Sequence, residues 1–281
     1  MLRIMIAAVL AVPALATGPE VFIQAHRGGL DEVPENTLVA YEHAWSIPGA
    51  IPEMDLQTTQ DGAIVLMHDD TPARTTDAPK EVADKTISEV TLAQTQEWDA
   101  GVKFGAQYKG TKVPTLDQVF AAMKGKPERQ VYLDLKAVDL GVLKQKILDA
   151  HLEKQVIFVH GDIAHCAELK ALFPGARVMT WLSGMPKQIR ARYEALTDAQ
   201  LAGVTQLQFH LPLQQVGPPI QYALDDAFLK QAAERLAKLG IDLQVRPMKF
   251  DHASLTHLVE LGIHWYVADA PAAFYKALTT P

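Results

Sequence analysis

The sequence contains a single cysteine, Cys166, among its 281 residues, so no intramolecular disulfide can form. A chain of this length can bury a core large enough to fold without covalent cross-links. Residues 163–169 read as helical, and a free cysteine in a helix is usually a small buried hydrophobe. We therefore expect Cys166 to be a packing residue and not a catalytic thiol.

Positive charge is also in short supply. The chain has 26 Lys and Arg against 33 Asp and Glu, which gives a formal net charge of −7. This balance leaves no basic stripe that could follow a polyanion. We therefore expect no nucleic acid partner.

Long hydrophobic runs are missing too, because the one marked run, residues 4–15, is shorter than the roughly 20 residues that span a bilayer. Arg3 precedes it, and Ala14-Leu15-Ala16 closes it. A basic start, a short apolar core and a small-x-small site are typical of a secretory signal peptide. We expect cleavage after Ala16, which removes residues 1–16. The mature chain would then be exported, to the periplasm or outside the cell, without stable membrane insertion.

Short apolar segments alternate with helical patterns along most of the chain, which is typical of parallel strands joined by crossover helices. The strand candidates are 22–25, 52–56, 131–135, 156–159, 177–182, 205–209, 242–245 and 265–268. The helix candidates are 37–45, 116–123, 140–150, 164–173, 187–201, 226–239 and 252–261. Eight such strands close a barrel, so we predict an α/β fold, a distorted (β/α)8 TIM barrel, in one domain over residues 17–281.

A ninth strand candidate, 64–68, follows 52–56 too closely for a parallel crossover, which needs about a dozen residues. Residues 60–62, Gln-Asp-Gly, suit a hairpin turn. We therefore predict an antiparallel excursion after the second barrel strand, which brings His68 back beside Glu53. Segment 71–115 is polar and weakly periodic, and we expect it to be an insertion over the mouth of the barrel.

Charged residues gather at the ends of the first three barrel strands, and in a TIM barrel these ends form the mouth where the chemistry takes place. They are His26, Arg27, Glu53, Asp55, Asp134 and Lys136. Crowded carboxylates repel one another unless a cation lies between them, and hard oxygen ligands suit Mg²⁺ or Ca²⁺. We predict that Glu53, Asp55 and Asp134 bind one divalent cation. The alternative is that they form salt bridges with Arg27 and Lys136.

Two histidines at this mouth, His26 and His68, can act as the general base and the general acid of a displacement at a phosphodiester. Arg27 and Lys136 could hold the non-bridging phosphate oxygens, a role compatible with that of counter-ions. We therefore interpret the chain as a metal-assisted phosphodiesterase that acts on a small molecule.

The residues that follow the first strand carry weaker signals. Gly28 and Gly29 would allow the backbone to approach a ligand closely. Asn36 is expected to cap the first helix, with Thr37 in its first turn. A site role for Glu35 or Asn36 stays open.

At these positions the sequence resembles the glycerophosphodiester phosphodiesterase family. The family pattern runs His-Arg-Gly, Pro-Glu-Asn-Thr, Glu-x-Asp-x-x-x-Thr-x-Asp-Gly, and then His-Asp with Arg-Thr-Thr. The matching segments here are His26-Arg27-Gly28, Pro34-Glu35-Asn36-Thr37, Glu53-Met54-Asp55, Thr59-Gln60-Asp61-Gly62, His68-Asp69 and Arg74-Thr75-Thr76. Weaker matches follow at 99–101, 113–116 and 268–271.

The resemblance implies a distorted (β/α)8 barrel, a divalent cation, and hydrolysis of glycerophosphodiesters to sn-glycerol 3-phosphate and an alcohol. It also implies that His26 and His68 act as acid and base and that Glu53 and Asp55 bind metal. The mechanism implied is attack by the glycerol 2-hydroxyl, giving a cyclic phosphate that water then opens.

The chain departs from the family pattern in two places. Asp134-Leu135-Lys136 replaces Glu-x-Lys, so the carboxylate reaches one methylene less far, and another cation or a water could fill the gap. Residues 243–246, Leu-Gln-Val-Arg, replace Trp-Thr-Val-Asn. Arg246 could bind an anionic group of the substrate, or it could form a surface ion pair.

Two alternative functions follow from these departures. One is phospholipase D-like hydrolysis of a larger lysophospholipid or sugar phosphodiester, and the other is a non-catalytic binding protein on the same barrel. The leaving alcohol, the choice between Ca²⁺ and Mg²⁺, the assignment of acid and base, and the oligomeric state stay open.

Overall fold

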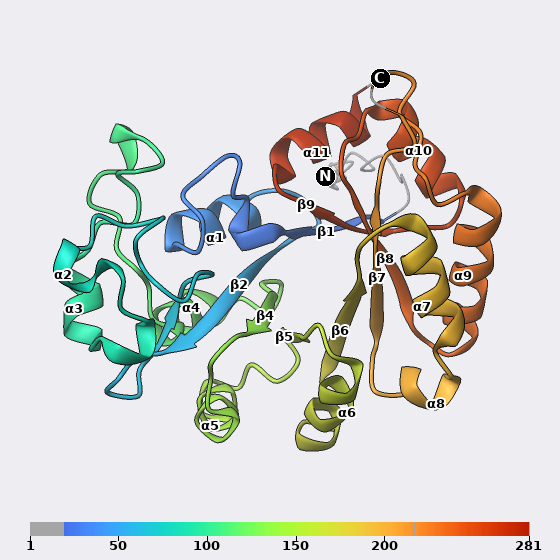
Figure 1. The fold of residues 1–281 in the computed structure, drawn as a ribbon. Coiled ribbons are helices and arrows are strands. Elements are labelled where there is room, and N and C mark those ends of the chain that lie inside the picture. Colours follow the sequence, from blue (N-terminus) through green and yellow to red (C-terminus); the bar gives the residue numbers. More distant parts are fainter. Residues whose placement is uncertain (1–19, 216, 281) are drawn as a thin grey trace, which may run out of the picture.

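The computed structural model describes residues 20–215 and 217–280, so the predicted signal peptide lies outside the described residues. Eight parallel strands close into a barrel (Figure 1), because β1 pairs with both β2 and β9. In barrel order they are β1 (Phe22–Ala25), β2 (Ala50–Thr58), β4 (Val131–Leu135), β5 (Val156–Val159), β6 (Arg177–Leu182), β7 (Gln206–Leu211), β8 (Asp242–Pro247) and β9 (Trp265–Ala268). The predicted TIM barrel is confirmed.

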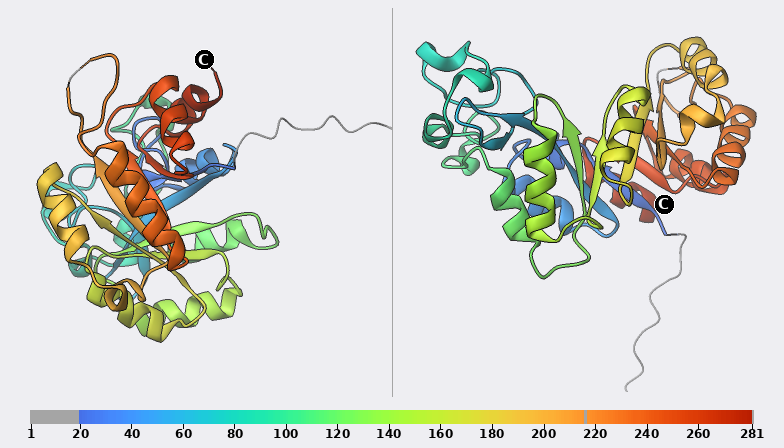
Figure 2. Two further views of the ribbon diagram at one scale, coloured as in Figure 1. Left: turned by 90° about the vertical axis from the view of Figure 1, so that its right-hand side faces the viewer. Right: turned by 90° about the horizontal axis from the view of Figure 1, so that it is seen from below.

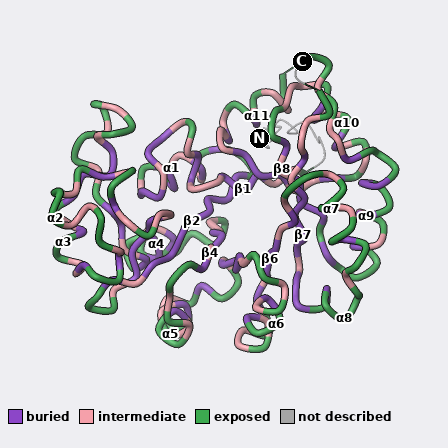
Figure 3. Tube along the Cα trace, in the orientation of Figure 1, coloured by how far each residue is buried: buried purple, intermediate pink, exposed green. Residues whose placement is uncertain are grey.

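Helices lie outside the strands in both views of Figure 2, and the strands form the buried interior in Figure 3. These outer helices are α1 (Leu38–Trp45), α4 (Leu116–Met123), α5 (Leu140–Ala150), α6 (Ile163–Leu172), α7 (Pro186–Ala195), α8 (Asp198–Leu201), α9 (Asp226–Lys238), α10 (His252–Glu260) and α11 (Pro271–Thr279). Cys166 is fully buried in α6, as expected, and burial raises the pKa of its thiol to about 12. Among the described residues, none of the helices combines the length and apolarity needed to cross a bilayer.

Two helix predictions need correction. The single helix expected over 187–201 is two helices, because Thr197 begins α8 with its own cap and accepts a hydrogen bond from the backbone N–H of Gln200. Helix α1 is capped by Thr37, whose hydroxyl accepts from the backbone N–H of Ala40, and not by Asn36. The side chain of Asn36 is therefore available for another role.

The predicted hairpin is present. Strand β3 (Ile64–Leu66) pairs antiparallel with the end of β2, with Leu56 opposite Leu66. Gly62, at φ +82°, closes the turn with a backbone hydrogen bond to Thr59. One edge of β2 thus pairs first with β1 and then with β3, so the residues that follow β1 enter the space between these two strands.

The inserted segment, residues 71–115, lies to one side of the barrel beyond the C-terminal end of β2 (Figures 1 and 2). It contains the short helices α2 (Lys80–Ala83) and α3 (Leu92–Glu97) and buries a small core of its own around Ile87 and Trp98. Val65 and Met67 belong to the same core, so the segment packs on the β3 side of the hairpin.

The barrel interior differs between its two halves. An apolar cluster that includes Ile157 and Met179 fills the half near β5 and β6. Three buried glutamines, Gln24, Gln208 and Gln244, lie on β1, β7 and β8, each two residues before a site residue. Side chains alternate along a strand, so each glutamine lies below its site residue on the inward face. The mouth therefore has a polar floor on this side.

Candidate active site

The predicted site residues meet at a cavity of about 210 Å³ at the C-terminal ends of the strands. The cavity is lined by seven of the eight predicted residues, His26, Arg27, Glu53, His68, Asp134, Lys136 and Arg246. Asp55 lies just behind this lining, 1% exposed, in contact with Lys136. A larger hollow of about 850 Å³ near α9 and α10 contains none of these residues, so here charge and histidines locate the candidate site better than size.

The turn after β1 brings the first two site residues into place. Arg27 adopts a left-handed conformation, φ +52°, and its backbone N–H donates to Glu53 Oε2 at 2.7 Å. Such a conformation is strained for a residue with a side chain. Gly28 follows at φ +83°, and a Cβ there would come within 2.5 Å of the Cβ of Ala40. The close approach at Gly28 is therefore to helix α1 and not to the cavity.

His26 is held by an aspartate from the far end of the chain. Its Nδ1 donates to Asp269 Oδ1 at 2.6 Å, and Arg246 Nη2 donates to both oxygens of the same carboxylate at 2.8 and 3.0 Å. Burial, followed by the charge of Arg246, lowers the pKa of His26. The Asp269 carboxylate fixes the proton of the neutral imidazole on Nδ1, so that Nε2 is left to accept a proton.

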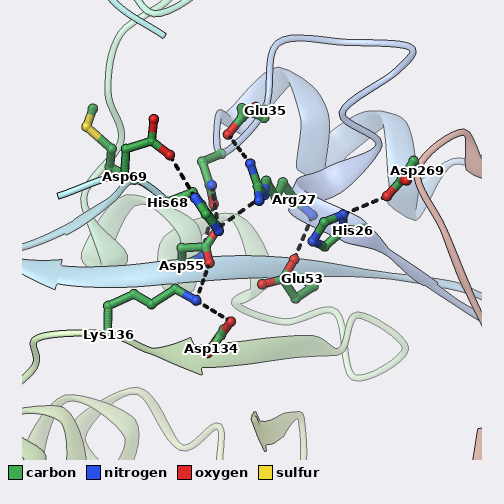
Figure 4. A network of polar contacts seen from close by, with 12 residues as sticks. His26, Arg27, Glu35, Glu53, Asp55, His68, Asp69, Asp134, Lys136 and Asp269 are labelled. Atoms are coloured by element: carbon green, nitrogen blue, oxygen red, sulfur yellow. Dashed lines mark hydrogen bonds and ion pairs between the residues drawn. The ribbon is translucent and has the colours of Figure 1, made fainter. Parts of the chain in front are cut away.

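His68 is held in the same way at the other side of the site (Figure 4), with its Nδ1 2.8 Å from Asp69 Oδ1. Arg74, from the inserted segment, donates to both oxygens of Asp69 and to both oxygens of Glu35. Glu35 in turn accepts from Arg27 Nη1 at 3.0 Å. One chain of contacts therefore links a site histidine to a site arginine through the insertion.

The acidic set is Glu53, Asp55 and Asp134, and one ligand oxygen from each lies within 4.8 Å of the others. Burial, and then the charge of a neighbouring carboxylate, raises the pKa of Glu53 well above its usual range. Burial also raises the pKa of Asp134. Three crowded oxygen donors, with raised pKa values at Glu53 and Asp134, are the donor set that a hard divalent cation stabilises, so the residues present fit such an ion.

Salt bridges account for part of this set only. Lys136 Nζ lies 2.6 Å from Asp134 Oδ2 and 3.2 Å from Asp55 Oδ1. Arg27 Nε is 3.8 Å from Asp55 Oδ2. Within residues 20–215 and 217–280, no cationic side chain lies within 4.0 Å of the Glu53 carboxylate. The alternative of purely structural ion pairs therefore leaves the buried Glu53 carboxylate without a cationic partner, its one hydrogen bond within the described residues coming from the backbone N–H of Arg27.

Asn36 supports the acidic set directly. It adopts a left-handed conformation, its Nδ2 donates to Asp55 Oδ2 at 2.8 Å, and its Oδ1 accepts from the backbone N–H of Asp55 at 3.0 Å. Tyr41 donates its hydroxyl to the same Oδ1 at 3.1 Å. These contacts fix the side-chain orientation of Asp55.

Besides Asp69 and Arg74, two further residues of the site were missing from the sequence interpretation. Asp269 belongs to the weak motif at 268–271, and it lies 243 residues from His26 in the sequence. His210 lies on β7 opposite Arg246 in the strand register and lines the cavity. Burial, reinforced by the charge of Arg246, lowers the pKa of His210 to about 4. The only signal for His210 in the sequence is its place near the end of a predicted strand.

Comparison with known proteins assigns the family. The model of the glycerophosphoryl diester phosphodiesterase family matches residues 26–261, most of the chain. A glycerophosphodiester phosphodiesterase of Caldanaerobacter subterraneus is 32% identical over 160 residues, 55% of this chain and 63% of that protein. One of Bacillus subtilis is 35% identical over 133 residues, 46% of this chain and 45% of that protein. The chain thus matches less than two thirds of the length of either relative.

Solved structures share the fold. A glycerophosphodiester phosphodiesterase from Agrobacterium tumefaciens superposes with a TM-score of 0.70 at 20% identity, covering 91% of this chain and 99% of that one. A phosphodiesterase from Oleispira antarctica, in complex with the product sn-glycerol-3-phosphate, gives a TM-score of 0.64 at 24% identity, with 92% and 97% of the chains covered. With the match of the family model, the chain belongs to the glycerophosphoryl diester phosphodiesterase family.

Proposed function

We propose that the protein hydrolyses glycerophosphodiesters to sn-glycerol 3-phosphate and an alcohol, with a divalent cation as cofactor. The observation that carries this proposal is the meeting, at one cavity, of a buried acidic set with two histidines that each face an aspartate. Its family and the names of its relatives support the same reaction.

Glu53, Asp55 and Asp134 would hold the cation, Mg²⁺ or Ca²⁺, since all three offer oxygen ligands. When bound, the cation supplies Lewis-acid stabilisation of the charge that develops on the phosphate oxygens. Asp134 is one methylene shorter than the glutamate of the family pattern. One of its carboxylate oxygens still lies within 4.8 Å of an oxygen of Glu53 and of Asp55. The missing methylene therefore leaves it within reach of an ion shared with the other two.

Arg27 and Lys136 would bind the non-bridging phosphate oxygens. Both line the cavity, and Nε of Arg27 is a buried donor without a hydrogen-bond partner among the described residues. A buried N–H without a partner costs free energy, which an anionic ligand at this position would recover.

The two histidines would transfer the protons. Each uses Nδ1 to contact an aspartate, so each has Nε2 left for the reaction. One Nε2 takes the proton of the attacking hydroxyl, and the other protonates the leaving oxygen. Asp269 and Asp69 orient the rings and hold a proton on each Nδ1, so the base is a neutral imidazole with a free Nε2 and the acid is an imidazolium with a second proton on Nε2.

We also propose that the mature protein acts outside the cytoplasm. The support for this is the sequence alone, in which residues 1–16 have the basic start, short apolar core and small-residue cleavage site of a signal peptide. Cell fractionation of the full-length chain with a C-terminal tag tests it, and recovery of the uncleaved chain in the cytoplasm would refute it.

The test of the reaction is release of sn-glycerol 3-phosphate from glycerophosphocholine by the purified protein. We expect turnover that EDTA abolishes, that Ca²⁺ or Mg²⁺ restores, and that His26→Ala removes. Arg235→Gln is the matched control, because Arg235 pairs with Asp198 on the outer surface, and it should retain full turnover. A folded wild-type protein without turnover on this substrate or on a lysophospholipid, with either metal, would refute the proposal.

A further inference from the structure

The wall of the cavity opposite the acidic set carries charge that the proposed reaction does not use. Strand order in the closed barrel places β8 four strands from β4 in either direction, so Arg246 on β8 faces Asp134 and Lys136 on β4 across the mouth. By the same count, His210 on β7 faces Glu53 on β2. The diester phosphate belongs to the β2 and β4 side, so the opposite wall meets another part of the substrate.

Arg246 has donors to spare at this wall. Its side chain is 20% exposed and lines the cavity. Among the described residues, only Nη2 has polar contacts, with the carboxylate of Asp269 and, at 3.2 Å, with Nδ1 of His26. Neither Nε nor Nη1 contacts a hydrogen-bond acceptor in the described part of the chain, and neither atom is sealed from solvent. The planar fork of a guanidinium matches a carboxylate or a phosphate, which can accept two parallel hydrogen bonds from it.

His210 adds a donor without adding a charge. It pairs in register with Arg246 on the neighbouring strand, and both side chains line the cavity. Its burial beside Arg246 keeps the ring neutral near pH 7, so one of its nitrogens carries a proton to donate. An arginine and a neutral histidine side by side form a site for one anionic group. Trp181 and Met179, which also line the cavity, offer no competing negative charge.

We propose that Arg246, with His210, binds a second anionic group of the substrate, a carboxylate or a phosphate monoester, beyond the scissile phosphodiester. This inference rests on the proposed function, because it names the class of glycerophosphodiester that the same site prefers. Arg246 is then a specificity-determining residue, and it also forms an ion pair, with Asp269 at the cavity wall.

The test is a pair of substrates that differ by one carboxylate, glycerophosphoserine and glycerophosphoethanolamine. We expect the wild-type kcat/KM to favour the serine diester by about tenfold or more, the range of a hydrogen bond to a charged group. Arg246→Gln also disturbs Asp269, so the rates on both substrates fall. The informative quantity is the ratio of the two kcat/KM values, which should drop to about one.

Two further variants keep the test sharp. Arg246→Lys retains a cation but not the fork, and it should keep a preference between that of the wild type and that of Arg246→Gln. Arg190→Gln removes an arginine that pairs with Asp225 on the surface, and it should leave the ratio unchanged. Glycerophosphoglycerol and its terminal phosphate monoester form a second pair, which distinguishes a phosphate from a carboxylate as the preferred group.

Each outcome decides the proposal. A wild-type ratio near one in both pairs would overturn it. A ratio that Arg246→Gln leaves unchanged would also overturn it and would assign Arg246 to the support of Asp269 alone. Absence of turnover on all four diesters would instead count against the proposed function, so the two failures are distinguishable.

Discussion

Four carboxylates around the cavity form two groups whose pKa values move in opposite directions. In the acidic set, burial raises the pKa of both Glu53 and Asp134. Next to the histidines, hydrogen bonds from Arg74 lower the pKa of Asp69 to about 2. Burial would raise the pKa of Asp269, but the hydrogen bond from His26 and the charge of Arg246 outweigh it and lower that pKa.

The difference between the groups is the supply of positive charge. Asp69 and Asp269 each have an arginine bound to both carboxylate oxygens. In the acidic set, the described residues offer only Lys136 within 3.2 Å and Arg27 at 3.8 Å from Asp55. A carboxylate with its own cation is a fixed hydrogen-bond acceptor and can orient a histidine. A buried cluster with too few cations is unstable until one binds. Under the proposed function, the carboxylates with their own arginine therefore orient the histidines, and those of the acidic set hold the metal.

Glu53→Gln should have the largest effect, because it removes a ligand charge and relieves the repulsion at the same time. We expect kcat to fall by more than about 100-fold, since loss of a mere support of a metal ligand already costs about 10–100-fold. In EDTA the melting temperature should stay the same or rise. Calcium or magnesium at 100 times the Kd should raise the wild-type melting temperature by about 5 °C or more.

The control for that experiment is the response of the variant to the metal. Glu53→Gln should show little of the metal-induced rise in melting temperature, measured by calorimetry with and without the ion. A variant that the ion stabilises as much as it does the wild type would place the cation elsewhere.

Asp269→Asn tests the other group. The amide can donate to Nδ1 of His26, which shifts the ring proton to Nε2 and blocks proton acceptance there. We expect kcat to fall by about 100-fold or more, because general acid–base catalysis contributes about 10²–10⁴-fold, with little change in KM. Nitrogen NMR of labelled histidine should show the change of tautomer. A loss of kcat with the tautomer unchanged would assign Asp269 a structural role only.

The geometry of the acidic set could be predicted from the sequence, whereas the contact of Asp269 and Arg246 with His26 could not. Glu53 and Asp55 alternate on one strand, so their common direction follows from strand geometry. The short turn likewise predicts the return of His68 along β2, where Met67 donates its backbone N–H to the carbonyl of Asp55. These are local relations, set by a strand period and a short turn.

Asp269 and Arg246 come together only through barrel closure. Their contact with His26 depends on how β8 and β9 stagger against β1, which no local pattern encodes. The predicted cap of α1 was wrong for a different reason. Asn36 and Thr37 both have side chains that cap helices well, and the contact of Asn36 with Asp55 leaves the cap to Thr37. Tertiary contacts thus override local preference at the site itself.

The two groups also predict opposite pH dependence of stability. Glu53 has a raised pKa, so between its usual 4.5 and that value the folded chain keeps a proton that the unfolded chain has lost. Stability of the metal-free protein therefore falls as the pH rises through this range. Urea unfolding in EDTA should give a lower free energy at pH 8 than at pH 5.5, and Ca²⁺ should remove the slope. The lowered pKa values of His26 and His210 add a rise of their own below about pH 6.5, which Glu53→Gln shows alone. A wild-type slope no more negative than that of this variant would contradict the raised pKa of Glu53.

Arg74→Gln should have the smallest effect, since Arg74 is 47% exposed and acts on the site only through Asp69 and Glu35. Exposed ion pairs add little stability, so the melting temperature should hardly change at pH 7. The pKa of Asp69, about 2 in the fold, should move back toward its usual 3.8, and the stability that the Asp69 carboxylate adds above pH 3.8 should shrink accordingly.

Activity of Arg74→Gln should fall by about three- to tenfold, because both His68 and Arg27 lose an indirect support. Arg129→Gln, which breaks a similar two-point contact with Glu42 away from the site, should leave activity intact. If both variants lose activity equally, the loss reflects general destabilisation and not the path through Asp69.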